Sequence, residues 1–219
     1  MSRAITASAL IVAALAASTA FADLRITEVA PQTTAGTPST INGDWWELSN
    51  SGPGAIDLAG YQWADTEDAL PSSDSNFFPA ITISPGQSII ILEESASSLA
   101  AWRANWGIPD TVVILGIDAM LDDATPDGDT FSGLGNTNDG VFFYDPSGVQ
   151  LSSYLYAANT RGVSFEADMA GNDLGLSVVG ENGAVLGANG DIASPGFAVP
   201  APGAMSMLAL GAVLARRRR

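Results

Sequence analysis

The chain has 219 residues, of which 47% are hydrophobic and 15% are charged, so it is not disordered as a whole and a packed core is expected. Its 24 acidic residues against 8 arginines give a net charge of -16, and a surface so negative repels nucleic acid. Cysteine, histidine and lysine are absent, which excludes disulfides, Ser-His-Asp triads, Cys/His zinc sites and lysine Schiff bases, and leaves carboxylate chemistry, binding of hard cations, or no chemistry.

The first 22 residues have the three parts of a secretory signal peptide. Arg3 supplies the positive start, residues 9–17 form a short apolar run, and residues 20–22 read Ala-Phe-Ala. Small residues three and one positions before the cut are typical of signal peptidase substrates. We therefore predict an N-terminal signal helix over residues 1–22 that is removed by signal peptidase after Ala22. The alternative is an uncleaved membrane anchor.

Short apolar runs from residue 24 onward predict β-strands. Leu24 and Ile26 alternate with polar neighbours, and Trp46 and Leu48 do the same, which is the period of half-buried strands. Turn sequences rich in Gly, Pro, Asn and Asp separate the runs, at residues 52–54, 84–86, 138–140 and 145–148. Strands this short and this often interrupted predict an all-β sandwich or barrel.

The same alternation assigns faces to the strand that holds two tryptophans. Trp46 is expected to face the core, whereas Trp45 and Glu47 are expected to face solvent. Residues 88–92 and 141–144 are apolar almost without interruption, and we expect them to be central strands covered on both faces.

One segment of the predicted sandwich has helical spacing. Leu99, Trp102 and Trp106 recur three and four residues apart after a serine-rich stretch, and Gly107 and Pro109 end the pattern. We expect a short helix over one end of the sandwich, with its tryptophans facing the core. The alternative is that these rings stack on sugars.

The densest acidic run follows at residues 122–130. Counted from Asp123, side-chain oxygens occupy positions one, three, five and seven with glycine at six, as in a calcium-binding loop. Position twelve is Leu134 instead of the usual glutamate. The run is therefore either a solvated loop or a weak calcium site. The candidate ligands of such a site are Asp122, Asp123, Asp127 and Asp129. We expect no other cofactor.

The C-terminal segment, residues 198–219, combines Pro200-Ala201-Pro202, an apolar run at 204–215 and four terminal arginines. Twelve helical residues span about 18 Å, less than the roughly 30 Å of a bilayer core. These parts resemble the bacterial PEP-CTERM sorting signal, with Ala201 where the family has Glu. The resemblance implies transient membrane association, cleavage near Pro200 and Pro202 by an exosortase-type protease, and release to the cell surface or exopolysaccharide matrix. A plain tail anchor is the alternative.

The body resembles the lamin tail domain. The matching stretches are the opening strand at residues 24–29, the Trp-x-Glu-Leu-x-Asn strand at 45–50, the Asp-Leu-x-Gly-aromatic turn at 57–61, and later Gly148 and the strand containing Tyr154. The resemblance implies an immunoglobulin-like β-sandwich over residues 23–197 that binds or scaffolds. The Gly- and Asn-rich residues 171–190 carry no readable structural pattern.

Carboxylates are the remaining route to catalysis. Glycoside hydrolysis needs two carboxyl groups about 5–9.5 Å apart across the substrate, and spacing in the sequence does not reveal such a pair. Neither the paired Asp-Thr/Ser-Gly of aspartic proteases nor a Gly-x-Ser-x-Gly elbow occurs. We therefore expect a secreted, non-enzymatic protein whose partners include matrix polysaccharide or surface proteins. The alternative is a carboxylate-based hydrolase of extracellular polysaccharide.

Overall fold

The computed structural model describes residues 24–33, 43–65, 76–122 and 133–201. Their strands are β1 (Leu24–Ala30), β2 (Trp45–Asn50), β3 (Ile56–Asp57), β4 (Gln62–Ala64), β5 (Asn76–Phe77), β6 (Thr82–Ile83), β7 (Ser88–Leu92), β8 (Val113–Gly116), β9 (Leu121–Asp122), β10 (Thr137–Tyr144), β11 (Gln150–Ala158), β12 (Phe165–Ala167), β13 (Asp173–Leu176), β14 (Val185–Leu186) and β15 (Ile192–Ala193). The helices are α1 (Leu99–Trp106) and the 3-10 helix η2 (Ile117–Ala119).

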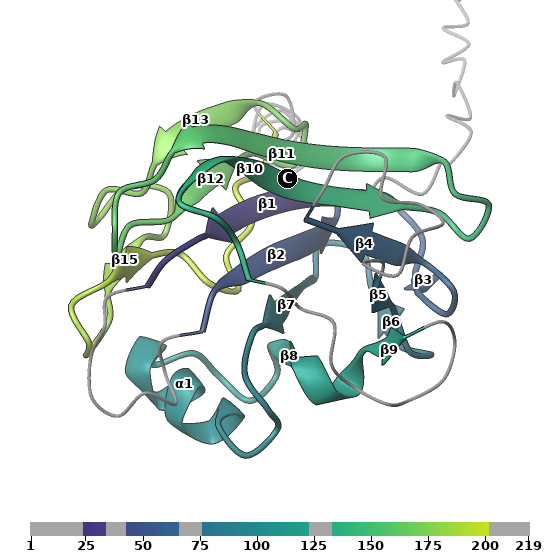
Figure 1. The fold of residues 1–219 in the computed structure, drawn as a ribbon, viewed down its shortest axis with the longest axis horizontal. Coiled ribbons are helices and arrows are strands. Elements are labelled where there is room, and N and C mark those ends of the chain that lie inside the picture. The colour runs from purple at the N-terminus through teal and green to yellow at the C-terminus, as the bar shows by residue number, and fades with distance from the viewer. Residues whose placement is uncertain (1–23, 34–42, 66–75, 123–132, 202–219) are drawn as a thin grey trace, which may run out of the picture.

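Two larger sheets form the body of the molecule (Figure 1). One has the strand order β13-β12-β1-β2-β7-β8, and the other has the order β11-β10-β4-β5-β9. Neighbouring strands in them are antiparallel except for β7 and β8, which are parallel because the connection through α1 carries the chain back to the same end. This arrangement confirms the predicted all-β sandwich with one short α-helix.

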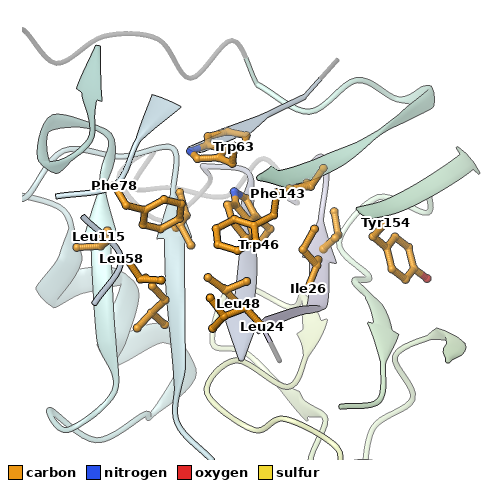
Figure 2. Close-up of a cluster of buried hydrophobic side chains, with 14 of the residues drawn as sticks. Leu24, Ile26, Trp46, Leu48, Leu58, Trp63, Phe78, Leu115, Phe143 and Tyr154 are labelled. Carbon is orange, nitrogen blue, oxygen red and sulfur yellow. The ribbon is translucent and has the colours of Figure 1, made fainter. Parts of the chain in front are cut away.

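The main core lies between these two sheets. Trp46 is fully buried, and its ring centroid lies 5.3 Å from that of Trp63, 6.2 Å from Phe78 and 6.5 Å from Phe143. Figure 2 shows these rings together, with Leu48 beside Trp46. The predicted inward orientation of Trp46 is thus confirmed.

A second core occupies the outer face of the six-stranded sheet. Trp45 is fully buried, with its ring centroid 5.5 Å from Trp102 and 6.2 Å from Trp106 on α1. The prediction that Trp45 faces solvent is therefore wrong, because the helix covers the face to which the alternation correctly assigned it. The predicted helix and the inward orientation of its two tryptophans are confirmed.

The long hairpin of β10 and β11 corrects one predicted turn and confirms another. Residues 138–140 lie within β10, where the backbone of Gly140 passes so close to β11 that a Cβ atom would lie 2.5 Å from the carbonyl oxygen of Tyr154. Glycine serves close strand approach here instead of a turn. The predicted turn at residues 145–148 connects the two strands, with the Gly148 amide donating to the Asp145 carbonyl at 2.9 Å.

The chain after β13 crosses the outer face of the six-stranded sheet, and we call residues 177–197 the C-terminal strap. At its start, Ser177 bonds to the carboxyl of Glu166 on β12; near its end, the Ser194 amide bonds to Glu28 on β1. The strap includes the short hairpin of β14 and β15. It therefore shares the outer face with α1 and gives structure to part of the Gly- and Asn-rich stretch.

Candidate functional site: two sets of carboxyl groups

The first set of carboxyl groups lies at one end of the sandwich. Asp44 immediately precedes β2 and Glu93 immediately follows β7. Because Trp45 pairs with Leu92 in these antiparallel strands, the two acids are brought side by side. The Asp44 amide lies 3.3 Å from Glu93 Oε2, and the Glu93 amide donates to the Asp44 carbonyl at 2.8 Å.

Asp44 also fastens two other segments to this end of the molecule. Its Oδ1 accepts the Gln32 amide at 2.6 Å, and its Oδ2 accepts the Leu134 amide at 2.9 Å. A Cβ atom on Gly133 would lie 3.2 Å from Glu93 Oε1 and 3.8 Å from Asp44 Oδ2, so both carboxyl groups face that glycine. We call Asp44 and Glu93 the end pair.

Burial and the repulsion between neighbouring carboxyl groups raise the pKa values of both members of the end pair. Burial raises the pKa of Glu93 to about 7, and the negative charge of Asp44 contributes to the rise. The pKa of Asp44 is raised as well, chiefly by burial, although its bonds to the Leu134 and Gln32 amides oppose the change. Glu93 can therefore hold or release a proton near neutrality, as a general acid or a pH-sensitive structural group would.

The predicted calcium site is mostly outside the described residues. Asp122 ends β9, where its backbone pairs with that of Asn76, while Asp123, Asp127 and Asp129 lie in the range 123–132 that the structure does not describe. Among the described residues, no three carboxylates are grouped so as to hold a metal ion. The chain resumes at Gly133, beside the end pair.

The predicted processing positions lie at the borders of the described chain. Ala22 and Pro202 fall outside it, whereas Pro200 is exposed and follows Val199, whose carbonyl accepts the Met169 amide at 2.8 Å. In the part of the chain that is described, no helix is long and apolar enough to cross a membrane.

The second set of carboxyl groups is buried under the strap and was missed by sequence reasoning. Glu47 was expected to face solvent, but it is 0% exposed because the strap covers the outer face of β2; its Oε2 accepts the Gly196 amide at 2.5 Å. Glu28 on β1 lies opposite both Glu47 on β2 and Glu166 on β12. We call these three residues the carboxyl ladder.

A β-bulge in β1 places Glu28 in this ladder. The register shifts between Ile26 and Glu28, so Thr27 and Glu28 both lie on the outer face. Hydrogen bonds on the outer face agree with this placement of both residues. Thr27 Oγ1 donates to the Glu47 carboxyl group, and Glu28 accepts the Ser194 amide of the strap. The sequence contains a sign of this bulge. Leu24 and Ile26 are two residues apart, as in a regular strand, but the next core residue, Val29, follows Ile26 by three.

The ladder lacks the access that a polysaccharide hydrolase requires. Its three carboxyl groups belong to side chains that are at most 2% exposed. A neighbouring cavity, lined by Ser164 and Asp191 among others, has a volume of about 10 Å³, which is room for roughly one water molecule. A sugar ring cannot lie between carboxyl groups that are enclosed in this way.

Comparison with known proteins agrees with this architecture. The family model described as Lamin Tail Domain matches residues 17–158, which include every described strand from β1 to β11. Strands β12–β15 and the strap follow the matched residues. No curated protein matches the sequence. The strand arrangement and the matched residues together show that the chain belongs to the lamin tail domain family, whose fold is an immunoglobulin-like sandwich.

Proposed function

We propose that this lamin tail domain protein is an exported, non-enzymatic binding or structural protein of the cell surface or extracellular matrix. The observation that carries the proposal is the use of its perturbed carboxyl groups as internal fasteners. Asp44, Glu47 and Glu28 each accept a backbone amide from a distant segment of the chain. Groups bound in this way stabilise a scaffold, and catalytic acids instead have to face a substrate.

Export and trimming at both ends complete the proposal. Signal peptidase would cut after Ala22 and an exosortase-type protease near Pro200 and Pro202, after transient membrane association through the tail. The positions of the strands favour such cuts, because β1 begins at Leu24 and the last backbone pairing described is that of Val199 with Asp168. Trimming there leaves every described strand intact. Matrix polysaccharide and surface proteins are the partners we propose.

Intact-mass measurement on protein from the cell envelope and matrix tests the trimming. We expect a species that begins at Asp23 and ends near Pro200 or Pro202. An Ala22→Arg variant should block cleavage by signal peptidase. We expect its mass to include the signal peptide but to lack the C-terminal segment. Recovery of only the full-length chain from wild-type cells would contradict the proposal.

The end pair favours a second candidate, a carboxylate-based hydrolase. Glu93, with its pKa near 7 beside Asp44, has the protonation behaviour of a general acid. The trimmed body should be incubated with extracellular polysaccharide, and both bound polysaccharide and newly released reducing ends should be measured. We expect binding without release. Release that is lost in Glu93→Gln but kept in the exposed control Asp57→Asn would establish the hydrolase instead.

A further inference from the structure

The carboxyl ladder bonds to the strap at both of its ends, whereas backbone bonds from the strap to residues 162–164 and bonds to Asn105 on α1 hold its middle part. Glu28 Oε1 accepts the Ser194 amide at 2.7 Å, and Glu47 Oε2 accepts the Gly196 amide at 2.5 Å. At the other end of the strap, Ser177 Oγ donates to Glu166 Oε1 at 2.8 Å and Asn182 Nδ2 donates to Glu166 Oε2 at 3.0 Å. Each of the three glutamates therefore bonds directly to the strap.

Apolar burial contributes little to holding the strap. Its large apolar side chains point largely to solvent, with Val178, Val179, Val185, Leu186 and Phe197 between 42% and 62% exposed. The apolar side chains that it buries are small, namely those of Ala184, Ala193 and Pro195. Segments with few buried apolar contacts open more readily than the rest of a fold. The strap can thus separate from the sheet without disrupting the core between the sheets.

The ladder brings three acidic groups into one dry row. Directly paired residues on neighbouring strands have Cβ atoms roughly 4.5–5.5 Å apart, so Glu28 lies within this distance range of both Glu47 and Glu166. Glu28 Oε2 is buried and accepts no hydrogen bond. Glu28 therefore has an acidic side chain on either side of it in a buried site, and negative charge at this spacing disfavours its ionised form.

We propose that the carboxyl ladder is a proton-operated latch, which holds the strap on the sheet while Glu28 and Glu47 are protonated and releases it when they ionise. Opening exposes the carboxyl groups of the ladder to water and separates them from the strap that covers them. The released state exposes a row of negative charge on the outer face of β12, β1 and β2. The protein would thereby present two different surfaces, depending on pH.

The charges around the ladder support this direction of switching. Burial raises the pKa of Glu28 well above its usual range, and the neighbouring Glu47 and Glu166 raise it further, although the bonds from Ser164 and Ser194 oppose the rise. Burial also raises the pKa of Glu47. Protons are thus bound more tightly when the strap is closed, and closure weakens as the pH rises above about 4.5, the ordinary value for glutamate.

Other charged groups packed nearby have partners of their own. On the strap, Asp191 accepts Asn189 Nδ2 at 2.7 Å, and Glu181 is exposed. On β1, the Arg25 guanidinium donates to the Leu151 carbonyl in the other sheet; on α1, Arg103 donates to the Val112 carbonyl. The charges that act on Glu28 most strongly are those of the ladder itself.

Hydrogen exchange of backbone amides, read by mass spectrometry at pH 5 and pH 8 and corrected for the intrinsic rates, tests the latch. We expect the opening constant of peptides within the strap to rise at least tenfold between these pH values, while peptides from β2 and β7 keep theirs. In Glu28→Gln, which keeps the acceptor oxygen but cannot ionise, we expect a rise of less than threefold. The matched control Glu181→Gln, on the exposed side of the strap, should respond as the wild type does.

Two results would overturn the latch. One is strap exchange in the wild type that does not change with pH, or that changes together with exchange in β7. The other is a full pH response in Glu28→Gln. Should that variant fail to fold, Glu47→Gln provides the same comparison, and the wild-type measurement alone still decides the first point.

Discussion

Trp45 and Trp46 are adjacent in the chain but fill different cores. Trp46 lies between the two sheets and Trp45 lies under α1, both with 0% exposure. We therefore expect Trp45→Ala and Trp46→Ala each to lower the free energy of unfolding by about 3–5 kcal/mol, because each leaves a large cavity. Urea denaturation measures both values. A loss below about 1 kcal/mol for Trp45→Ala would mean that α1 does not pack on this strand.

For Trp45 and Glu47, the sequence predicted the face of the strand correctly but not the burial of that face. The alternation correctly placed Trp45 and Glu47 on one face of β2 and Trp46 on the other. It could not show that α1 and the strap cover the outer face, because those segments lie far away in the chain and their docking depends on tertiary contacts. An acid between apolar neighbours has the same local pattern whether solvent or a strap lies over it.

The raised pKa of Glu93 predicts a pH dependence of stability at a single residue. With a pKa of about 7 in the folded protein and an ordinary value of 4.5, Glu93 binds more protons in the folded state between these values. The contribution of Glu93 to the free energy of unfolding is therefore largest below about pH 4.5 and is lost as the pH rises through 7. Wild type should therefore lose stability relative to Glu93→Gln between pH 5 and pH 8 in urea denaturation. The control Asp57→Asn should track the wild type, and a constant difference for Glu93→Gln would refute the expectation.

At the scale of elements, the strands with clear alternation were predictable and the short late ones were not. Strands β12–β15 contain two to four residues each, too few for a period of two to stand out. The pairing of β12 depends on β1, far earlier in the chain. The turn that was wrongly predicted at residues 138–140 has a related cause. The sequence alone does not distinguish a glycine that allows two strands to approach closely from a glycine that allows a turn.

Two glycines of the β10–β11 hairpin are needed for different reasons, Gly148 for the backbone conformation of a turn and Gly140 for close approach of the strands. Gly148 has a φ of 79° with open space where a Cβ would be, so Gly148→Ala should cost about 1–2 kcal/mol for the left-handed backbone alone. In Gly140→Ala the new Cβ would press on the backbone of β11, which has to move away from β10, and we expect a loss of about 3 kcal/mol. Thermal unfolding of both variants gives the order. A smaller loss for Gly140→Ala would indicate a different pairing of β10 and β11.

At the scale of the whole molecule, the negative charge predicts a response to cations. Removal of both predicted terminal segments would take away Arg3 and residues 216–219, which leaves the body more acidic than the net charge of -16 indicates. Self-repulsion opposes compaction and is weakened by screening salt or by bound calcium. We expect calcium to raise the melting temperature, and NaCl of equal ionic strength to reproduce most of the rise.

A calcium site at residues 122–130 would behave differently from screening. Its stabilisation would saturate with calcium alone, at the millimolar concentrations typical of extracellular modules. The double variant Asp127→Asn with Asp129→Asn would abolish that saturable part but hardly alter the response to NaCl. Melting curves that are the same in calcium, EDTA and matched NaCl would dismiss both effects.

The position of β1 inside its sheet also governs the order in which the chain can fold. β1 pairs on one side with β2, but its other partner is β12, and the Ser194 amide that bonds to Glu28 lies 166 residues further along. During synthesis the second edge of β1 therefore stays open until nearly the whole body has emerged. Long-range pairing of this kind is slow and leaves strand edges exposed to aggregation. A chain whose first strand is completed this late stays unfolded for most of its synthesis, which is compatible with the proposed export in an unfolded state.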